Sequence, residues 1–135
     1  MTLRQDILIR QGETWSHVYT HRDSAGDAVD LTGYSARMSI KESYEGATEA
    51  YLSSGADADG GSIALGGAAG TVTLSMTAAQ TSALLNLLFY TVLEGPARRA
   101  ARNVDFLYDV EIVSGAGAVT RVIEGRLRVQ REVTG

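Results

Sequence analysis

The two histidines of the chain, His17 and His21, are the first residues to test for metal or acid–base chemistry. They fall in TWSHVYTH, a segment rich in β-branched and aromatic residues that is typical of a strand. On a strand they would share a face, but at roughly 3.3 Å per residue they would stand about 13 Å apart. That separation excludes binding of one metal ion by both rings. We therefore expect a strand residue and a loop residue, and no metal site.

An acidic loop offers a second candidate, for calcium. The run Asp57-Ala58-Asp59-Gly60 is similar to the start of an oxygen-ligand calcium loop. The later ligands and the bidentate acid of such a loop are missing, however. The sequence favours an ordinary acidic, glycine-rich loop, with calcium binding at Asp57 and Asp59 left open. Asp23 and Asp27, which flank Gly26, fit turn chemistry better.

Carboxylates gather near the C-terminal third of the chain, at Asp105, Asp109, Glu111 and Glu124. A glycosidase would need two of them to converge in a cleft, and nothing in their spacing selects a pair. With the two histidines unsuited to act together, a Ser-His-Asp site is equally unsupported. The chain has no cysteine, which excludes a disulfide, a thiol nucleophile and a cysteine-based zinc site. We expect no enzymatic activity and no cofactor.

An arginine cluster opposes the acidic balance of the chain and follows an apolar run, FYTVL. Arginine forks can form bidentate hydrogen bonds with carboxylates, so the cluster could dock on an acidic surface of a neighbouring subunit. The alternative is a solvated loop. The predicted partner-binding residues are Phe89, Tyr90, Val92, Leu93, Arg98, Arg99 and Arg102.

Composition limits the remaining classes of function. The chain has 135 residues, which is most simply one domain spanning residues 1–135. Its formal charge of −4 argues against a general nucleic-acid binder, because such a protein needs many cationic phosphate contacts. The N-terminus has charges at Arg4, Asp6 and Arg10 and is no signal peptide, and no stretch approaches a membrane span. We expect synthesis and folding in the cytoplasm.

The elements that must position these residues are mostly short strands. Residues 106–130 give the strongest pattern, two long strands joined by a glycine-containing turn at 114–118. Alternation places Phe106, Tyr108, Val110 and Ile112 in the core, facing a return strand whose inward residues would be Val119, Ile123, Leu127 and Val129. The other expected strands lie at 5–11, 14–21, 34–41, 48–53 as an edge strand, 63–65 and 71–76. Thr77 would cap a helix over 78–88, and 87–105 would form an arm or protruding hairpin.

Many short strands and one short helix predict an all-β sandwich or Greek-key barrel. We expect no parallel α/β sheet, because one helix cannot supply the crossover connections that its parallel strands need.

Several sequence blocks resemble small tail-associated proteins of tailed bacteriophages and prophages, and in particular the immunoglobulin-like N-terminal domain of siphophage baseplate upper proteins. These blocks are GETW at 12–15, the loop RDSAGD at 22–27, AVDLTGYSARMSIK at 28–41, GGSIALGGAAGTVTLSMTAAQT at 60–81 and YDVEIVSGAGAVTRVIEGRLRVQREVT at 108–134. The resemblance implies an immunoglobulin-like antiparallel β-sandwich that attaches fibres or receptor-binding proteins to the tail. It also implies several copies in the particle, other virion proteins as partners, and neither catalysis nor a cofactor. Nucleic acid and membrane are not expected partners.

The chain differs from that family in two ways. The segment 87–105 is an insertion, which could be a contact arm particular to this virion. The chain also stops at Gly135, just after the last strand, which favours an adaptor or ring component of the tail over a complete fibre.

Two rival functions remain open. A head decoration or head–tail connector subunit could use the same kind of β-sandwich. A carbohydrate-binding module would use aromatic stacking platforms, for which the candidates are Trp15, Tyr19, Tyr34, Tyr44 and Tyr51.

Overall fold

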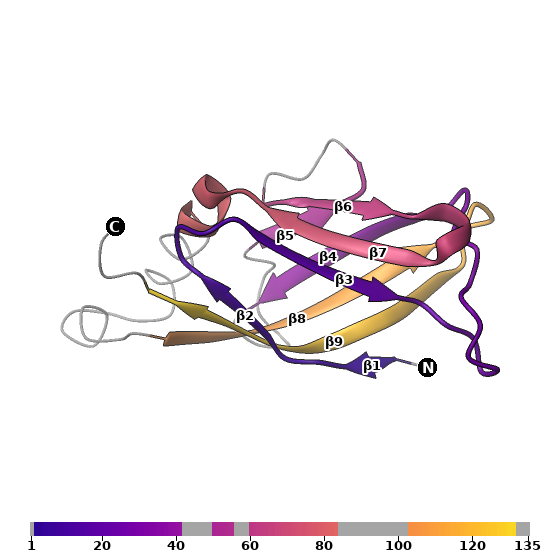
Figure 1. Cartoon of the computed structure of the whole chain (residues 1–135), viewed down its shortest axis with the longest axis horizontal. Helices are drawn as coiled ribbons and strands as arrows, with labels where there is room; N and C mark the ends of the chain where they lie inside the picture. The colour runs from indigo at the N-terminus through magenta and orange to yellow at the C-terminus, as the bar shows by residue number, and fades with distance from the viewer. Residues whose placement is uncertain (1, 42–49, 56–59, 84–102, 132–135) are drawn as a thin grey trace.

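The protein is described by a computed structural model over residues 2–41, 50–55, 60–83 and 103–131 (Figure 1). Strands dominate these residues, as the sequence predicts. The strands are β1 (Leu3–Arg4), β2 (Ile7–Arg10), β3 (Trp15–Thr20), β4 (Ser35–Lys41), β5 (Ala50–Ser53), β6 (Ser62–Leu65), β7 (Thr71–Met76), β8 (Asn103–Val113) and β9 (Val119–Gln130). A 3₁₀ turn, η1 (Gly67–Ala69), joins β6 to β7.

All nine strands belong to one mixed sheet in the order β1-β9-β8-β4-β5-β6-β7-β3, with β2 also paired to β9. Most neighbours are antiparallel, but β1 and β2 run parallel to β9. The pair β5/β6 is parallel too, and it consists of the single match Ser53↔Ser62. Over the described residues the protein is therefore mostly β-strand with one short helix, as expected for an all-β chain, and its sheet is mixed where a purely antiparallel one was expected.

The sheet curls so that its two ends approach each other (Figure 1). The short connection 11–14 requires this curl, since it links β2 on the β9 end to β3 at the opposite end. Side chains from both ends meet in one continuous core, which includes Ile9, Met38, Leu74, Phe106 and Leu127.

The β8/β9 hairpin forms the longest ladder of the sheet, from Asn103↔Gln130 to Val113↔Val119. The alternation predicted for β8 is confirmed, because Phe106, Tyr108, Val110 and Ile112 are all buried. One prediction for β9 is wrong: Val119 is 51% exposed instead of facing the core.

The cause of this error is a shift in register on β9. The ladder slips between Val110 and Glu111, where Val110 pairs with Ile123 but Glu111 pairs with Arg121. Val122 is thus the extra residue of a β-bulge, and both Val122 and Ile123 are buried. Beyond the bulge the side-chain alternation is reversed, which moves Val119 to the outer face.

The link between β1 and β2 passes close to β9 at a glycine. A Cβ atom on Gly125 would lie 2.2 Å from the backbone oxygen of Gln5, so only glycine permits this close approach. The hydroxyl of buried Tyr108 donates to the same Gln5 oxygen. The amide of Arg126 donates to Asp6 Oδ1 at 3.1 Å. These contacts hold the link between β1 and β2 against the hairpin.

Other boundaries differ from the predicted ones. β5 is not an edge strand, because β4 pairs with it on one side and β6 on the other. β8 begins at Asn103, so the last residues of the predicted 87–105 arm belong to a strand. Val104 is buried opposite Val129, and this inward packing extends the ladder beyond the expected start at Phe106. The rest of the arm, from 87 to 102, lies outside the described residues.

The predicted helix begins where expected. Residues 78–83 are helical, and residues 84–88 of the expected helix lie outside the described part. The amide of Gln80 donates to Thr77 Oγ1 at 3.1 Å, while the amide of Thr77 donates to Gln80 Oε1 at 2.9 Å. This reciprocal capping box satisfies two backbone donors at the start of the helix. In the described ranges no helix has the length and apolar character needed to cross a bilayer.

Candidate interaction surfaces

The partner-binding residues predicted from the sequence lie outside the described residues. This applies to Phe89, Tyr90, Val92, Leu93, Arg98, Arg99 and Arg102, to the acidic-loop residues Asp57 and Asp59, and to Tyr44. Their roles stay predictions. The described residues form three candidate surfaces: the outer face of the hairpin, the pocket beside it and the two open edges of the sheet.

His17 lies on the inward face of β3, and His21 directly follows the strand. The His17 ring stacks on Trp15 at a centroid distance of 6.4 Å, and the His21 ring lies 6.3 Å from that of Tyr19. His17 Nε2 and His21 Nδ1 are buried without a hydrogen-bond partner. Burial lowers the pKa of His21, which favours the neutral ring. Within the described ranges no group of three potential metal ligands occurs.

Arginines on neighbouring strands pair with the carboxylates of the hairpin. Arg128 donates from Nε and Nη2 to the two Asp105 oxygens, at 2.7 and 3.0 Å. Arg37 Nε donates to Glu111 Oε1 at 3.0 Å. The bond to Arg128 lowers the pKa of Asp105. On the outer face, Asp105 and Glu111 thus each form a salt bridge with an arginine on the adjacent strand.

A third arginine sits between two carboxylates. Arg121 Nε lies 3.4 Å from Asp109 Oδ2, and its Nη1 lies 3.6 Å from Glu124 Oε2. Burial nevertheless raises the pKa of Asp109, because desolvation outweighs the attraction of Arg121 and Lys41. Both carboxylates thus share one cation.

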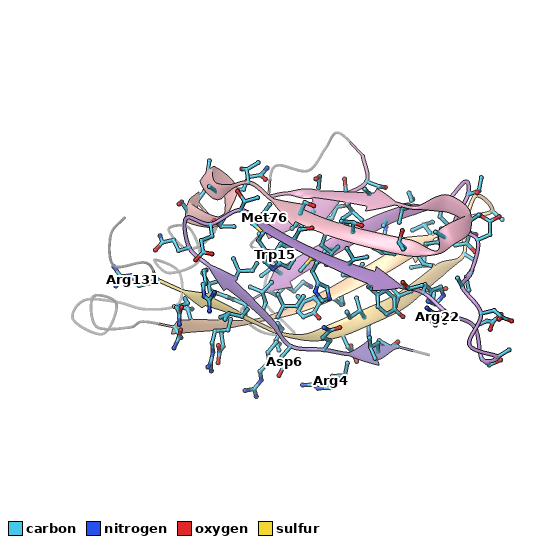
Figure 2. The ribbon with its side chains drawn as sticks, viewed as in Figure 1. Arg4, Asp6, Trp15, Arg22, Met76 and Arg131 are labelled. Carbon is cyan, nitrogen blue, oxygen red and sulfur yellow. The ribbon has the colours of Figure 1, made fainter. Side chains whose placement is uncertain are left out.

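A pocket of about 190 Å³ opens beside these groups. Strands β1, β4, β8 and β9 line it, and its charged residues are Arg4, Lys41, Asp109, Arg121 and Glu124. Figure 2 shows the side chain of Arg4 pointing away from the body of the sheet. Salt bridges within the described ranges involve neither Arg4 nor Lys41. With both acids held by Arg121, the pocket is suited to receive an acidic side chain on these two cations.

The two ends of the sheet form a seam, bordered by β1 and β2 on one side and β3 on the other. No ladder joins β3 to β1 or β2 in the part of the chain that the structure describes. Large exposed apolar side chains concentrate here: Leu3 on β1, Leu8 on β2 and Val18 on β3 are 43%, 44% and 58% exposed. Because all three lie on strands that border the seam, the seam is a candidate contact surface.

The aromatic residues weighed for carbohydrate binding are mostly committed to packing. Trp15, Tyr19 and Tyr34 pack against the core, and Tyr51 on β5 is half-buried. Figure 2 shows Trp15 near Met76, its partner in the β3/β7 ladder.

Sequence reasoning missed the cations of the hairpin surface and the pocket. It named the carboxylates but not Arg4, Arg37, Lys41, Arg121 and Arg128 as their neighbours. The sequence could have paired Asp105 with Arg128 through the register of the hairpin, but only if the bulge at Val122 had been recognised. The adjacent apolar residues Val122 and Ile123, which break the alternation of β9, are the signal for that bulge.

Comparison with known proteins adds no relative: the chain matches no protein-family model and no curated protein sequence.

Proposed function

We propose that the chain is a non-enzymatic structural protein of a tailed-bacteriophage virion. It acts at the tail tip or baseplate as an adaptor that attaches fibres or receptor-binding proteins. Its place in a phage tail rests on the sequence blocks quoted above, and its partners are other virion proteins and further copies of itself.

The strand order supports the immunoglobulin-like part of this proposal. In chain order, β3 to β9 correspond to strands B, C, C′, D, E, F and G of a variable-type immunoglobulin domain. The groups β9-β8-β4-β5 and β3-β7-β6 then match its two sheets, joined here by the single Ser53↔Ser62 pair. The chain departs from antibody domains in having no cysteine, and its one tryptophan lies on β3 instead of β4.

The observation that carries an adaptor role is the seam. Leu3, Leu8 and Val18 leave apolar surface beside two strand edges, a combination that proteins normally protect. A protein that works by repeated contacts with neighbours has a use for such a surface.

The test is to locate the protein in purified particles of the encoding phage or induced prophage. Mass spectrometry should detect the chain in tailed particles, and immunogold labelling should place it at the end of the tail distal to the head. Label on the head would favour the decoration or connector alternative, and a chain missing from intact particles would overturn the proposal.

The arginine cluster gives a second test of the same proposal. Changing Arg98, Arg99 and Arg102 together to serine should reduce incorporation of the protein into particles. The matched control replaces the exposed pair partners Arg37 and Arg128 by serine. Unchanged incorporation of the first variant would remove the cluster from the interface.

A further inference from the structure

The open edge of β3 exposes a defined set of backbone groups. The amide of His21 donates to the Gly70 oxygen at 2.8 Å. His21 and Gly70 are therefore a hydrogen-bonded pair of the antiparallel β3/β7 ladder, and every second residue before His21 belongs to such a pair as well. These residues are Tyr19, His17 and Trp15, which lie opposite Val72, Leu74 and Met76. In an antiparallel ladder the intervening residues turn their N–H and C=O groups the other way. Ser16, Val18 and Thr20 therefore present donors and acceptors to the seam.

This edge lacks the features that prevent strand addition. Proteins blunt edge strands with charged residues, proline, bulges or very short length. β3 has six residues, WSHVYT, with no lysine, arginine, acid or proline, and its pairing with β7 has no register shift. The opposite edge is divided into two shorter strands, because β1 has two residues and β2 four, with Gln5 and Asp6 between them, and both strands end in an arginine.

From this contrast we infer that β3 pairs antiparallel with β3 of a second copy of the chain, about a two-fold axis at Val18. This inference rests on the proposed function in taking a further copy as the available partner.

Self-pairing fits the sequence of the edge. With the axis at Val18, the two Val18 residues form a hydrogen-bonded pair and place their exposed side chains against each other on the outer face. Ser16 lies opposite Thr20 of the other copy, a cross-strand combination that can share a side-chain hydrogen bond.

No Lys, Arg, Asp or Glu lies within β3, so pairing of the two edges sets no like charges against each other; Glu13 and Arg22 lie beyond the two ends of the strand. A contact made twice by the same surface closes as a dimer instead of propagating as a filament.

The first experiment measures molar mass by light scattering during size-exclusion chromatography over a range of concentrations. The wild type should be a dimer, and Val18→Lys should be a monomer because like charges would oppose each other at the axis. Val119→Lys is the matched control, since Val119 is a similarly exposed strand valine on β9, and it should remain dimeric. Circular dichroism of Val18→Lys should match the wild type and show that the fold is intact.

The second experiment tests the register. The chain has no cysteine, so Val18→Cys introduces a single thiol at the axis, and a short bismaleimide should link two copies through it. Val119→Cys should link far less under the same conditions. A monomeric wild type, or a dimer that Val18→Lys leaves unchanged, would overturn the inference.

These results are separable from the virion test. A monomeric protein that still labels the tail would refute the β3 pairing alone, whereas a Val18-dependent dimer missing from particles would refute only the proposed function.

Discussion

At the scale of single residues, Gly125 has little freedom to change. A Cβ added there would meet the Gln5 backbone oxygen at 2.2 Å, and this oxygen is held by Tyr108. Gly125→Ala should therefore lower the free energy of unfolding by about 1–3 kcal/mol, as overpacking does in a core. Gly115→Ala is the control, because its nearest neighbour, the Gly33 oxygen, would be 3.6 Å away. Equal urea midpoints for the two variants would show that β1 and β2 do not depend on this approach.

Two aspartates of the hairpin should respond to pH in opposite ways. Folding lowers the pKa of Asp105 through its bond to Arg128 and raises that of Asp109 through burial. Ionised Asp105 thus stabilises the fold above its ordinary pKa of 3.8, and that contribution disappears as the pH falls through the lowered value. Ionised Asp109 opposes folding at neutral pH, and its penalty vanishes below 3.8.

Urea unfolding between pH 7 and pH 3 can check these signs. Asp105→Asn should be slightly less stable than the wild type at pH 7, since exposure to solvent weakens the pair. Asp109→Asn should be as stable or more stable there, despite losing Arg121. Both differences should shrink toward pH 3, and a clearly destabilised Asp109→Asn at pH 7 would contradict the assignment.

At the scale of elements, a threonine hydroxyl joins the start of the helix to the turn that closes the sheet. Thr81 Oγ1 accepts from the Gly12 amide at 3.0 Å, and its proton lies within reach of the Glu13 and Ala78 oxygens, each at 3.0 Å. Thr81 is fully buried. Thr81→Val keeps the shape but leaves the Gly12 amide without this partner, so it should cost about 1–3 kcal/mol.

Thr73→Val on β7 is the control for Thr81→Val, because its side chain is half-buried on the outer face of a strand. Chemical denaturation should show little change for it. If both variants unfolded at the same urea concentration, the Thr81 bonds would not hold the turn.

The elements also show what the sequence could and could not predict. The alternation in β4, β7 and β8 was sufficient, because one face of each strand meets the core and the other meets water. Alternation did not predict which side chains of β9 face the core, because the bulge at Val122 shifts the register within a continuous strand. The start of β8 was missed because Val104, although in phase with Phe106, directly follows the arginine-rich segment and was assigned to the arm; its pairing with Val129 shows that it belongs to the strand.

At the scale of the whole molecule, strand content followed from local patterns but strand partners did not. The parallel pairing of β1 and β2 with β9 depends on a close approach at Gly125 that joins residues about 120 positions apart, as the Asp6–Arg126 bond shows. Local alternation carries no information about such distant partners. The cations of the pocket, from β1, β4 and β9, were missed for the same reason.

Two groups of strands are joined by very little backbone pairing. A single residue pair, Ser53↔Ser62, links the β3-β7-β6 group to the rest of the sheet. The core, however, is continuous across this link, since Leu52 on β5 is fully buried and its side chain would lie 2.8 Å from a Cβ added at Gly61. Shared side-chain packing should therefore couple the two groups more strongly than the backbone link does.

We expect a single unfolding transition. Trp15 is the only tryptophan and lies on β3, so its fluorescence reports the smaller group, while far-ultraviolet circular dichroism reports all strands. In urea the two signals should change together, as in a two-state domain. Leu52→Ala should shift both by the same amount, at a cost of about 2–5 kcal/mol for a buried leucine. Measuring these curves in the Val18→Lys background removes self-association. A tryptophan transition at lower urea than the dichroism transition would mean that the β3-β7-β6 group unfolds separately.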